Sequence, residues 1–133
     1  MRVVVLSDTH YLPQYRTLLE KTVTEVAALN PDCVIAAGDV GERLMGFDAM
    51  LALLSHLPCP RLILAGNHDL WARDGLSSQQ LWEHELPRLT HGHGAIWLEG
   101  ENWVNDGLGV CGTLAWYDYT GKDPAINMTD ADY

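Results

Sequence analysis

The chain has 133 residues, of which 47% are hydrophobic and 20% charged, a composition typical of one globular domain. Its 8 basic and 18 acidic residues give a formal net charge of −10, the wrong sign for binding a phosphate backbone, so a nucleic-acid partner is not favoured. The longest apolar stretch, residues 44–57, is shorter than the roughly 20 residues of a membrane span, and the apolar N-terminal run is too short for a signal peptide, so we expect no membrane partner.

The three cysteines indicate neither a disulfide framework nor a zinc knuckle. Cys33, Cys59 and Cys111 are odd in number, widely spaced and outside any C-x-x-C motif. A reducing, cytoplasmic location fits this pattern best.

The first 65 residues alternate between strand and helix patterns. Apolar runs predict buried strands of a parallel sheet over residues 2–7, 33–37 and 61–65, and the first strand is predicted to be buried on both faces. Apolar residues recur at helical spacing over residues 14–30 and from Phe47 to Leu57, after a polar loop over residues 38–46. The order β-α-β-α-β, with right-handed crossovers, predicts half of a doubly wound α/β layer.

The pattern changes after residue 65. Residues 79–86 predict a short helix, and the Glu-Gly and Asp-Gly turns at 99–100 and 106–107 predict antiparallel hairpins. The hairpin strands are expected over residues 96–99, 102–104 and 108–111, and residues 113–133 show no periodicity. The predicted fold class is therefore α/β, with a β-α-β-α-β start followed by short hairpin strands.

Side chains that bind metals follow each of the three predicted parallel strands. Asp8 and His10 lie two residues apart after the first strand and can point the same way from extended backbone, and Asp39 follows a glycine after the second. The third strand ends in Gly66-Asn67-His68-Asp69. Ligands of open α/β sheets bind at the carboxyl ends of the strands, and mixed oxygen and nitrogen donors suit manganese, iron or zinc.

These motifs resemble those of the calcineurin-like metallophosphoesterase superfamily. Asp8-x-His10, Gly38-Asp39 and Gly66-Asn67-His68-Asp69 occur in that order, about 30 residues apart, over about the first half of the chain. The resemblance implies a metallophosphoesterase-like α/β sandwich with two divalent metal ions, manganese, iron or zinc, and a phosphoester substrate. The implied enzyme is a phosphatase or phosphodiesterase that hydrolyses a phosphate mono- or diester.

The resemblance also implies a role for each motif residue. Asp8 and His10 would bind the first metal, Asp39 would bridge both metals, and Asn67 would bind the second. His68 would face the substrate, with Asn67, and donate a proton to the leaving group while a metal-bridging hydroxide attacks phosphorus. His68 and Asp39 are thus the predicted catalytic residues.

Some family members continue the second motif as G-D-x-x-D-R, and this chain has Gly38-Asp39-Val40-Gly41-Glu42-Arg43. Glu42, in place of the aspartate, could orient His68, and Arg43 could bind phosphate oxygens. A solvated helix start with a surface ion pair is the other interpretation of Glu42 and Arg43. Asp69 is predicted, like Glu42, to support the ligands without touching the metals. Trp71 could form a wall of the substrate pocket, but we favour the interpretation that it packs in the core.

The family completes its metal site with a later lone histidine and a Gly-His-x-His motif, and neither is found in its expected place. His91-Gly92-His93-Gly94 has the H-x-H spacing, but it precedes the hairpin strands, so we interpret it as a solvated turn before Ile96.

We therefore expect residues 1–133 to form a single, partial metallophosphoesterase domain that resembles the N-terminal part of the family. The alternative is an incomplete fragment or non-catalytic module that binds one metal or a phosphate group without turnover. An incomplete sandwich would expose apolar surface and an unpaired sheet edge, which predicts self-association.

Overall fold

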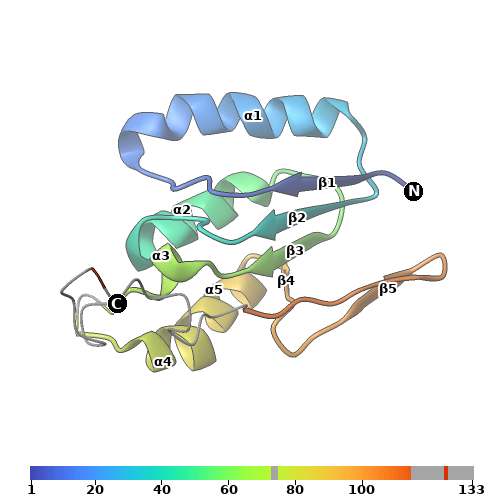
Figure 1. The fold of residues 1–133 in the computed structure, drawn as a ribbon. Coiled ribbons are helices and arrows are strands. Elements are labelled where there is room, and N and C mark those ends of the chain that lie inside the picture. The colour runs from blue at the N-terminus through green and yellow to red at the C-terminus, as the bar shows by residue number, and fades with distance from the viewer. Residues whose placement is uncertain (73–74, 115–124, 126–133) are drawn as a thin grey trace.

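A computed structural model describes residues 1–72, 75–114 and 125. Most of the predicted aperiodic segment 113–133 therefore lies outside the described residues. The centre of the fold is a four-stranded parallel sheet (Figure 1). Its strands lie in the order β1 (Val3–Leu6), β2 (Cys33–Ala37), β3 (Arg61–Leu64) and β4 (Ile96–Trp97).

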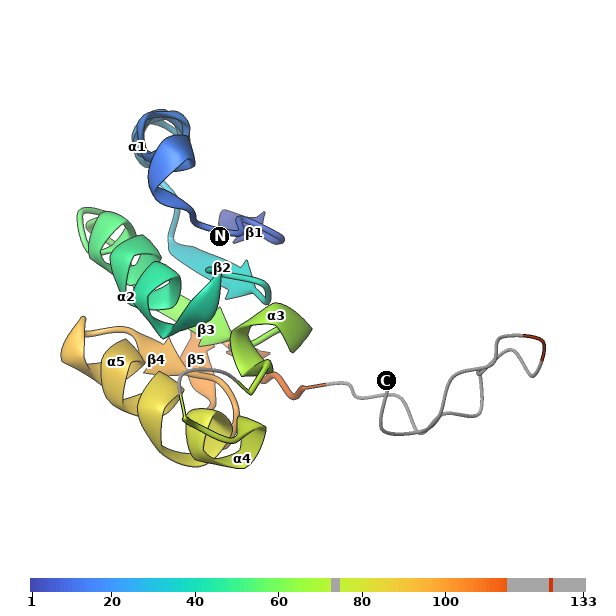
Figure 2. The same ribbon diagram turned by 90° about the vertical axis from the view of Figure 1, so that its left-hand side faces the viewer.

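The helices that connect these strands lie on one side of the sheet, as Figure 2 shows for α1, α2 and α5. The helical elements are η1 (Pro13–Tyr15), α1 (Arg16–Ala28), α2 (Arg43–Leu54), α3 (Asn67–Leu70), α4 (Ser78–Gln80), η2 (Leu81–Glu85) and α5 (Leu86–Gly92). The predicted α/β fold class and its β-α-β-α-β start are confirmed. A two-stranded antiparallel hairpin, β5 (Trp103–Asn105) with β6 (Leu108–Val110), follows the sheet.

The fourth strand corrects the hairpin prediction for residues 96–99. Ile96 pairs with Leu62, and Trp97 with Ile63, so this segment extends the parallel sheet beside β3. The helical residues 78–92 supply the crossover that parallel pairing needs. The hairpin predicted at the Asp106-Gly107 turn does form, between β5 and β6.

Two helical segments differ from the ranges that their apolar patterns predict. α2 begins at Arg43, before the predicted start at Phe47, and ends at Leu54, before the predicted end at Leu57. It buries residues around most of its circumference, so its apolar residues form no clear single stripe that marks its ends. The helix predicted over 79–86 continues to Gly92 through a π-helical turn. Pro87 follows that turn, and its missing N–H favours such a change in helical register.

Alternate residues of the strands pack on the two faces of the sheet. Val34, Ala36 and Ile63 belong to the main core beneath the helices. On the opposite face, the buried residues Cys33 and Leu62 form a smaller cluster with Leu98, against which the partly buried Trp103 and Val110 of the hairpin pack. Both faces are therefore covered at β3.

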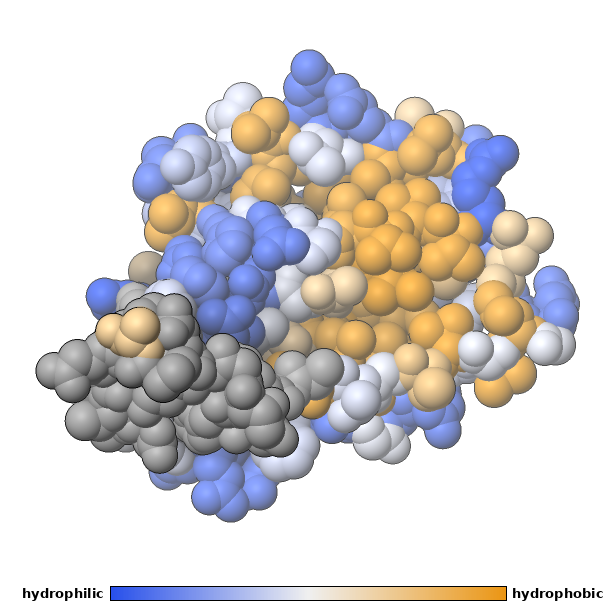
Figure 3. Space-filling model, in the orientation of Figure 1, coloured by the Kyte–Doolittle hydropathy of each residue, from blue (hydrophilic) through white to orange (hydrophobic). Residues whose placement is uncertain are grey.

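The prediction that the first strand is buried on both faces is wrong. Val3 and Val5 are 37% and 58% exposed, whereas Val4 and Leu6 are partly buried against the helices. Orange side chains accordingly form a broad apolar area on the face of the molecule seen in Figure 3. Whether this surface leads to self-association stays a prediction.

Candidate metal centre

The candidate centre lies where the loops after β1, β2 and β3 meet. Backbone hydrogen bonds continue the parallel pairing of β1 and β2 into these loops, from Asp8 N–H to the Gly38 carbonyl at 3.2 Å and from His10 N–H to the Asp39 carbonyl at 2.9 Å. The predicted ligand residues of the first two strands are therefore held in register by main-chain contacts.

Three of the predicted ligands have left-handed backbone. The φ angles are 55° at Asp8, 40° at His10 and 49° at Asp39. Asp8 and His10 are therefore not on extended backbone as expected from the sequence. Left-handed conformations cost about 1–2 kcal/mol at residues with a Cβ, so surrounding contacts must stabilise them.

The loop after β3 approaches Asp39 so closely that only glycine fits at position 66. A Cβ there would lie 2.2 Å from Asp39 Oδ1 and 2.4 Å from the Asp39 backbone nitrogen. The next turn begins α3, and the His68 N–H donates to Asp39 Oδ1 at 3.0 Å. The glycine thus lets His68 and Asp39 share one small volume.

The buried Asp69 carboxylate connects the loops after β2 and β3. It accepts three backbone N–H groups, from Val40 at 3.1 Å, Gly41 at 3.0 Å and Gly66 at 2.9 Å. Burial raises the pKa of Asp69 to about 6, although the three donors oppose this shift. Asp69 is therefore placed to support the loops, with its carboxylate committed to the backbone.

Glu42 contacts both histidines of the predicted site. Its Oε1 lies 3.1 Å from His10 Nδ1 and 2.9 Å from His68 Nδ1, and the two rings meet edge to face with centroids 4.6 Å apart. Burial, the largest single effect, raises the pKa of Glu42, but the contacts with both histidines outweigh it, so the pKa lies below its ordinary value. A carboxylate only accepts hydrogen bonds, so each Nδ1 donates to Glu42, and the Nε2 atoms are the ring nitrogens left for a metal or a substrate.

His10, Asp39 and His68 form a group that can hold a metal ion. One donor atom from each lies within 4.8 Å of the others, and His10 Nε2 is 3.7 Å from Asp39 Oδ2. Donors that share an ion lie up to about 4.4 Å apart, twice a metal–ligand distance, so small shifts suffice. Imidazole nitrogen with carboxylate oxygen is a donor set that fits zinc, iron or manganese.

The other predicted site residues lie on the same three loops or at the helix starts that follow them. The exposed Asp8 places Oδ1 4.0 Å from His10 Nε2, and Asn67 is exposed at the start of α3. Arg43, at a φ of 62°, begins α2 directly after Glu42. The sequence interpretation did not favour a site position for Trp71, yet its ring stacks on His68 with centroids 3.8 Å apart.

The two late histidines lie apart from this group. His91 is in the last turn of α5 and pairs with Glu101 at 2.6 Å, and His93 caps that helix and pairs with Asp48 of α2 at 2.8 Å. The segment predicted as a solvated turn is thus partly helical. Its two histidines instead link the end of α5 to Glu101 and to Asp48 of α2.

A family model, calcineurin-like phosphoesterase, matches residues 1–124. The chain belongs to this family. No curated protein matches the sequence. Among the described residues, the longest and most apolar helices still fall short of what a membrane crossing requires.

The solved structures that match the chain include the following two. A phosphopantetheinyl hydrolase from Mycobacterium tuberculosis aligns over 96% of this chain and 47% of its own, with a TM-score of 0.73 and 22% identity. A protein of unknown function, AQ665 from Aquifex aeolicus, aligns over 80% of this chain and 56% of its own, with a TM-score of 0.39 and 16% identity. The first likeness shows a shared fold, and the chain spans about half the length of these solved proteins.

Proposed function

We propose that this calcineurin-like phosphoesterase takes part in the metal-dependent hydrolysis of a phosphate mono- or diester. The observation that carries the proposal is the meeting of His10, Asp39 and His68 at one edge of the sheet. Membership in the family supports the reaction class. The name of the mycobacterial neighbour, a hydrolase, agrees with it.

The proposed centre takes two divalent ions, with Asp8 and His10 on the first, Asp39 between them and Asn67 on the second. Bound there, the ions would polarise the phosphoryl oxygens and supply a hydroxide nucleophile at neutral pH. The surrounding contacts support this arrangement, because Asp39 is held by the His68 N–H and His10 by the Glu42 carboxylate.

His68 is the proposed proton donor to the leaving-group oxygen. Glu42 accepts from its Nδ1, which leaves Nε2 as the nitrogen that would carry the proton to the leaving group. Trp71 covers one face of the same ring and limits its rotation. Arg43, adjacent in sequence to Glu42, is proposed to bind the phosphoryl oxygens.

Substitution of the central aspartate tests the proposal. We expect Asp39→Asn to abolish metal-dependent hydrolysis of phosphate mono- and diesters while the chain stays folded, because asparagine tolerates left-handed backbone but is a weaker metal ligand. Asp106→Asn is the matched control, since Asp106 has a φ of 48° in the β5–β6 turn. Hydrolysis of both ester classes and bound metal per chain are measured together.

The stoichiometry separates the two interpretations of the centre. Two ions per chain with turnover that needs Asp39 would support the dinuclear enzyme. One ion without turnover would instead support a module that binds a single metal or a phosphate group. Undiminished metal-dependent turnover in Asp39→Asn would overturn the proposed site.

A further inference from the structure

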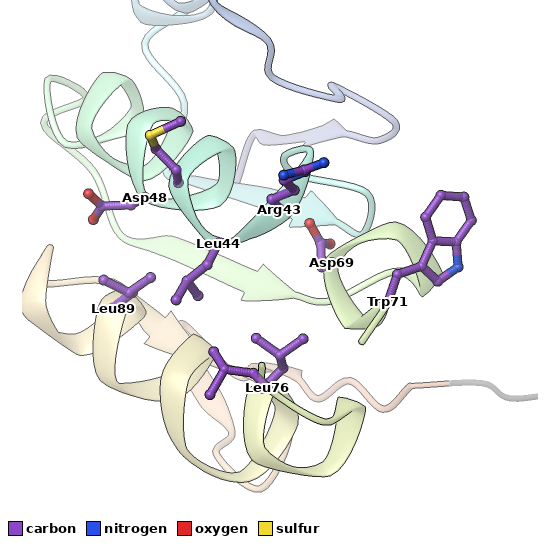
Figure 4. A pocket seen from close by; sticks show the side chains of 9 residues that line it. Arg43, Leu44, Asp48, Asp69, Trp71, Leu76 and Leu89 are labelled. Carbon is purple, nitrogen blue, oxygen red and sulfur yellow. The ribbon is translucent and has the colours of Figure 1, made fainter. Parts of the chain in front are cut away.

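A pocket of about 500 Å³ adjoins the candidate centre, between α2, α3 and the α4–α5 segment. This volume is within the range of about 300–1,000 Å³ that small-molecule sites occupy. Figure 4 shows Leu44, Leu76 and Leu89 around the space between α2 and α5, with Arg43 and Asp69 toward α3. The pocket thus has an apolar part and an end that carries charged groups.

The charged end adjoins the candidate centre through Trp71 and Arg43. Arg43 directly follows Glu42, whose carboxylate contacts both site histidines. Trp71, which also lines the pocket, stacks on His68 at 3.8 Å. A phosphoryl group held at the centre would therefore have its organic substituent beside this opening.

The apolar part is lined by four leucine side chains, together with the exposed Met45. Leu81 is buried, and the partly buried Leu44, Leu76 and Leu89 complete the lining. The pocket's two carboxylates are already engaged, Asp69 by backbone N–H groups and Asp48 by His93. An acidic substituent would meet these carboxylates, whereas an uncharged apolar substituent would contact the leucines.

We infer that this pocket binds the uncharged, apolar alkyl or aryl group of the phosphoester whose phosphoryl group the centre holds. The inference rests on the proposed function and adds a substrate class to it. It favours phosphoesters of apolar alcohols or phenols over those whose organic part is itself strongly charged.

Binding of alkyl phosphonates to the full chain, loaded with zinc, tests the inference by calorimetry. Each buried methylene contributes about fourfold in affinity, so we expect hexylphosphonate to bind at least about 10-fold more tightly than ethylphosphonate. A phosphonate with a five-methylene chain that ends in a carboxylate should lose this gain. In methyl NMR spectra, hexylphosphonate should shift Leu44, Leu76, Leu81 and Leu89, and leave the exposed Leu18 of α1 unchanged.

Leu76→Trp, which fills the pocket, should remove most of the dependence on chain length. Leu18→Trp is the matched control, since Leu18 is 62% exposed and outside the pocket lining. If Leu76→Trp does not fold, the methyl shifts of the unsubstituted chain still decide the matter.

Hydrolysis of ethyl and hexyl phosphate and of their methyl diesters, measured alongside as release of the alcohol, separates this inference from the proposed function. Equal turnover and equal phosphonate affinity for both chain lengths would overturn the pocket assignment and leave hydrolysis standing. Chain-length-dependent binding with shifts at the four leucines, but without turnover, would support the pocket and count against the enzyme. Absence of both binding and turnover would overturn both.

Discussion

The loop after β2 and the turn between β5 and β6 place an aspartate in the same backbone conformation for different reasons. Asp39 has a φ of 49° and Asp106 a φ of 48°. Asp106 is exposed and, with Gly107, reverses the chain in a two-residue hairpin turn that favours left-handed residues. Asp39 is only 13% exposed in its side chain and touches the loop after β3.

The difference shows what stabilises the candidate centre. In the hairpin, local chain geometry accounts for the conformation. At the centre, the left-handed Asp39 lies on a loop held from the loop after β3, chiefly by the Asp69 carboxylate and the close approach of Gly66, and the loop after β1 is in turn bonded to the loop after β2. Substitutions that remove these tertiary contacts should therefore be much more costly than similar substitutions in the hairpin.

The largest effect on stability is expected from Asp69→Asn. An asparagine keeps one acceptor oxygen and replaces the other with an amide NH₂. Inside this buried site, the NH₂ group would face a backbone N–H that now donates to Asp69, so two donors would oppose each other. We expect a loss of about 3 kcal/mol in the free energy of unfolding, from urea titration. Asp106→Asn should change it by less than about 0.5 kcal/mol. Similar values for the two variants would contradict the comparison.

Gly66→Ala should have the next largest effect. Its new Cβ would overlap Asp39 Oδ1 and the Asp39 backbone nitrogen, so the loops must separate, at a cost of about 2 kcal/mol. Gly109→Ala in β6 is the control, because nothing lies within 4 Å of a Cβ at that position. We expect Gly66→Ala to lose zinc affinity and Gly109→Ala to keep it, as measured by competition with a chromogenic chelator. A Gly66→Ala chain with unchanged stability and affinity would show that the loops tolerate separation.

Local patterns predict the strands and the residues that end them, because apolar runs and short motifs depend on neighbouring residues. The sequence therefore places Asp8, His10, Asp39 and the motif from Gly66 at one edge of the sheet. Local patterns do not predict which strand the fourth strand pairs with. Residues 96–97 pair with β3 because a helical segment carries the chain back across the sheet.

The fine geometry of the centre depends on contacts between loops. The left-handed Asp8 and His10 donate backbone hydrogen bonds to the loop after β2, about 30 residues away along the chain. The stacking of Trp71 on His68 likewise depends on how α3 ends. Patterns of neighbouring residues therefore predict neither the left-handed backbone nor the Trp71 contact. In contrast, the G-D-x-x-E-R spacing did suggest that Glu42 orients His68.

The smallest of the three effects is expected from Glu42→Gln, and it concerns metal binding. Glutamine keeps an oxygen that can accept from both Nδ1 atoms that now share Oε1, but it removes the negative charge, so the two hydrogen bonds that fix the histidine tautomers weaken. We expect zinc affinity to fall about tenfold, and nitrogen NMR of the imidazoles to show a mixed tautomer at His10 or His68. Glu101→Gln removes the corresponding charge from His91, an exposed pair apart from the centre, and should leave both readouts unchanged. If zinc affinity and tautomers are the same in both variants, Glu42 does not orient the histidines, and the surface ion pair considered from the sequence becomes the better interpretation of this residue.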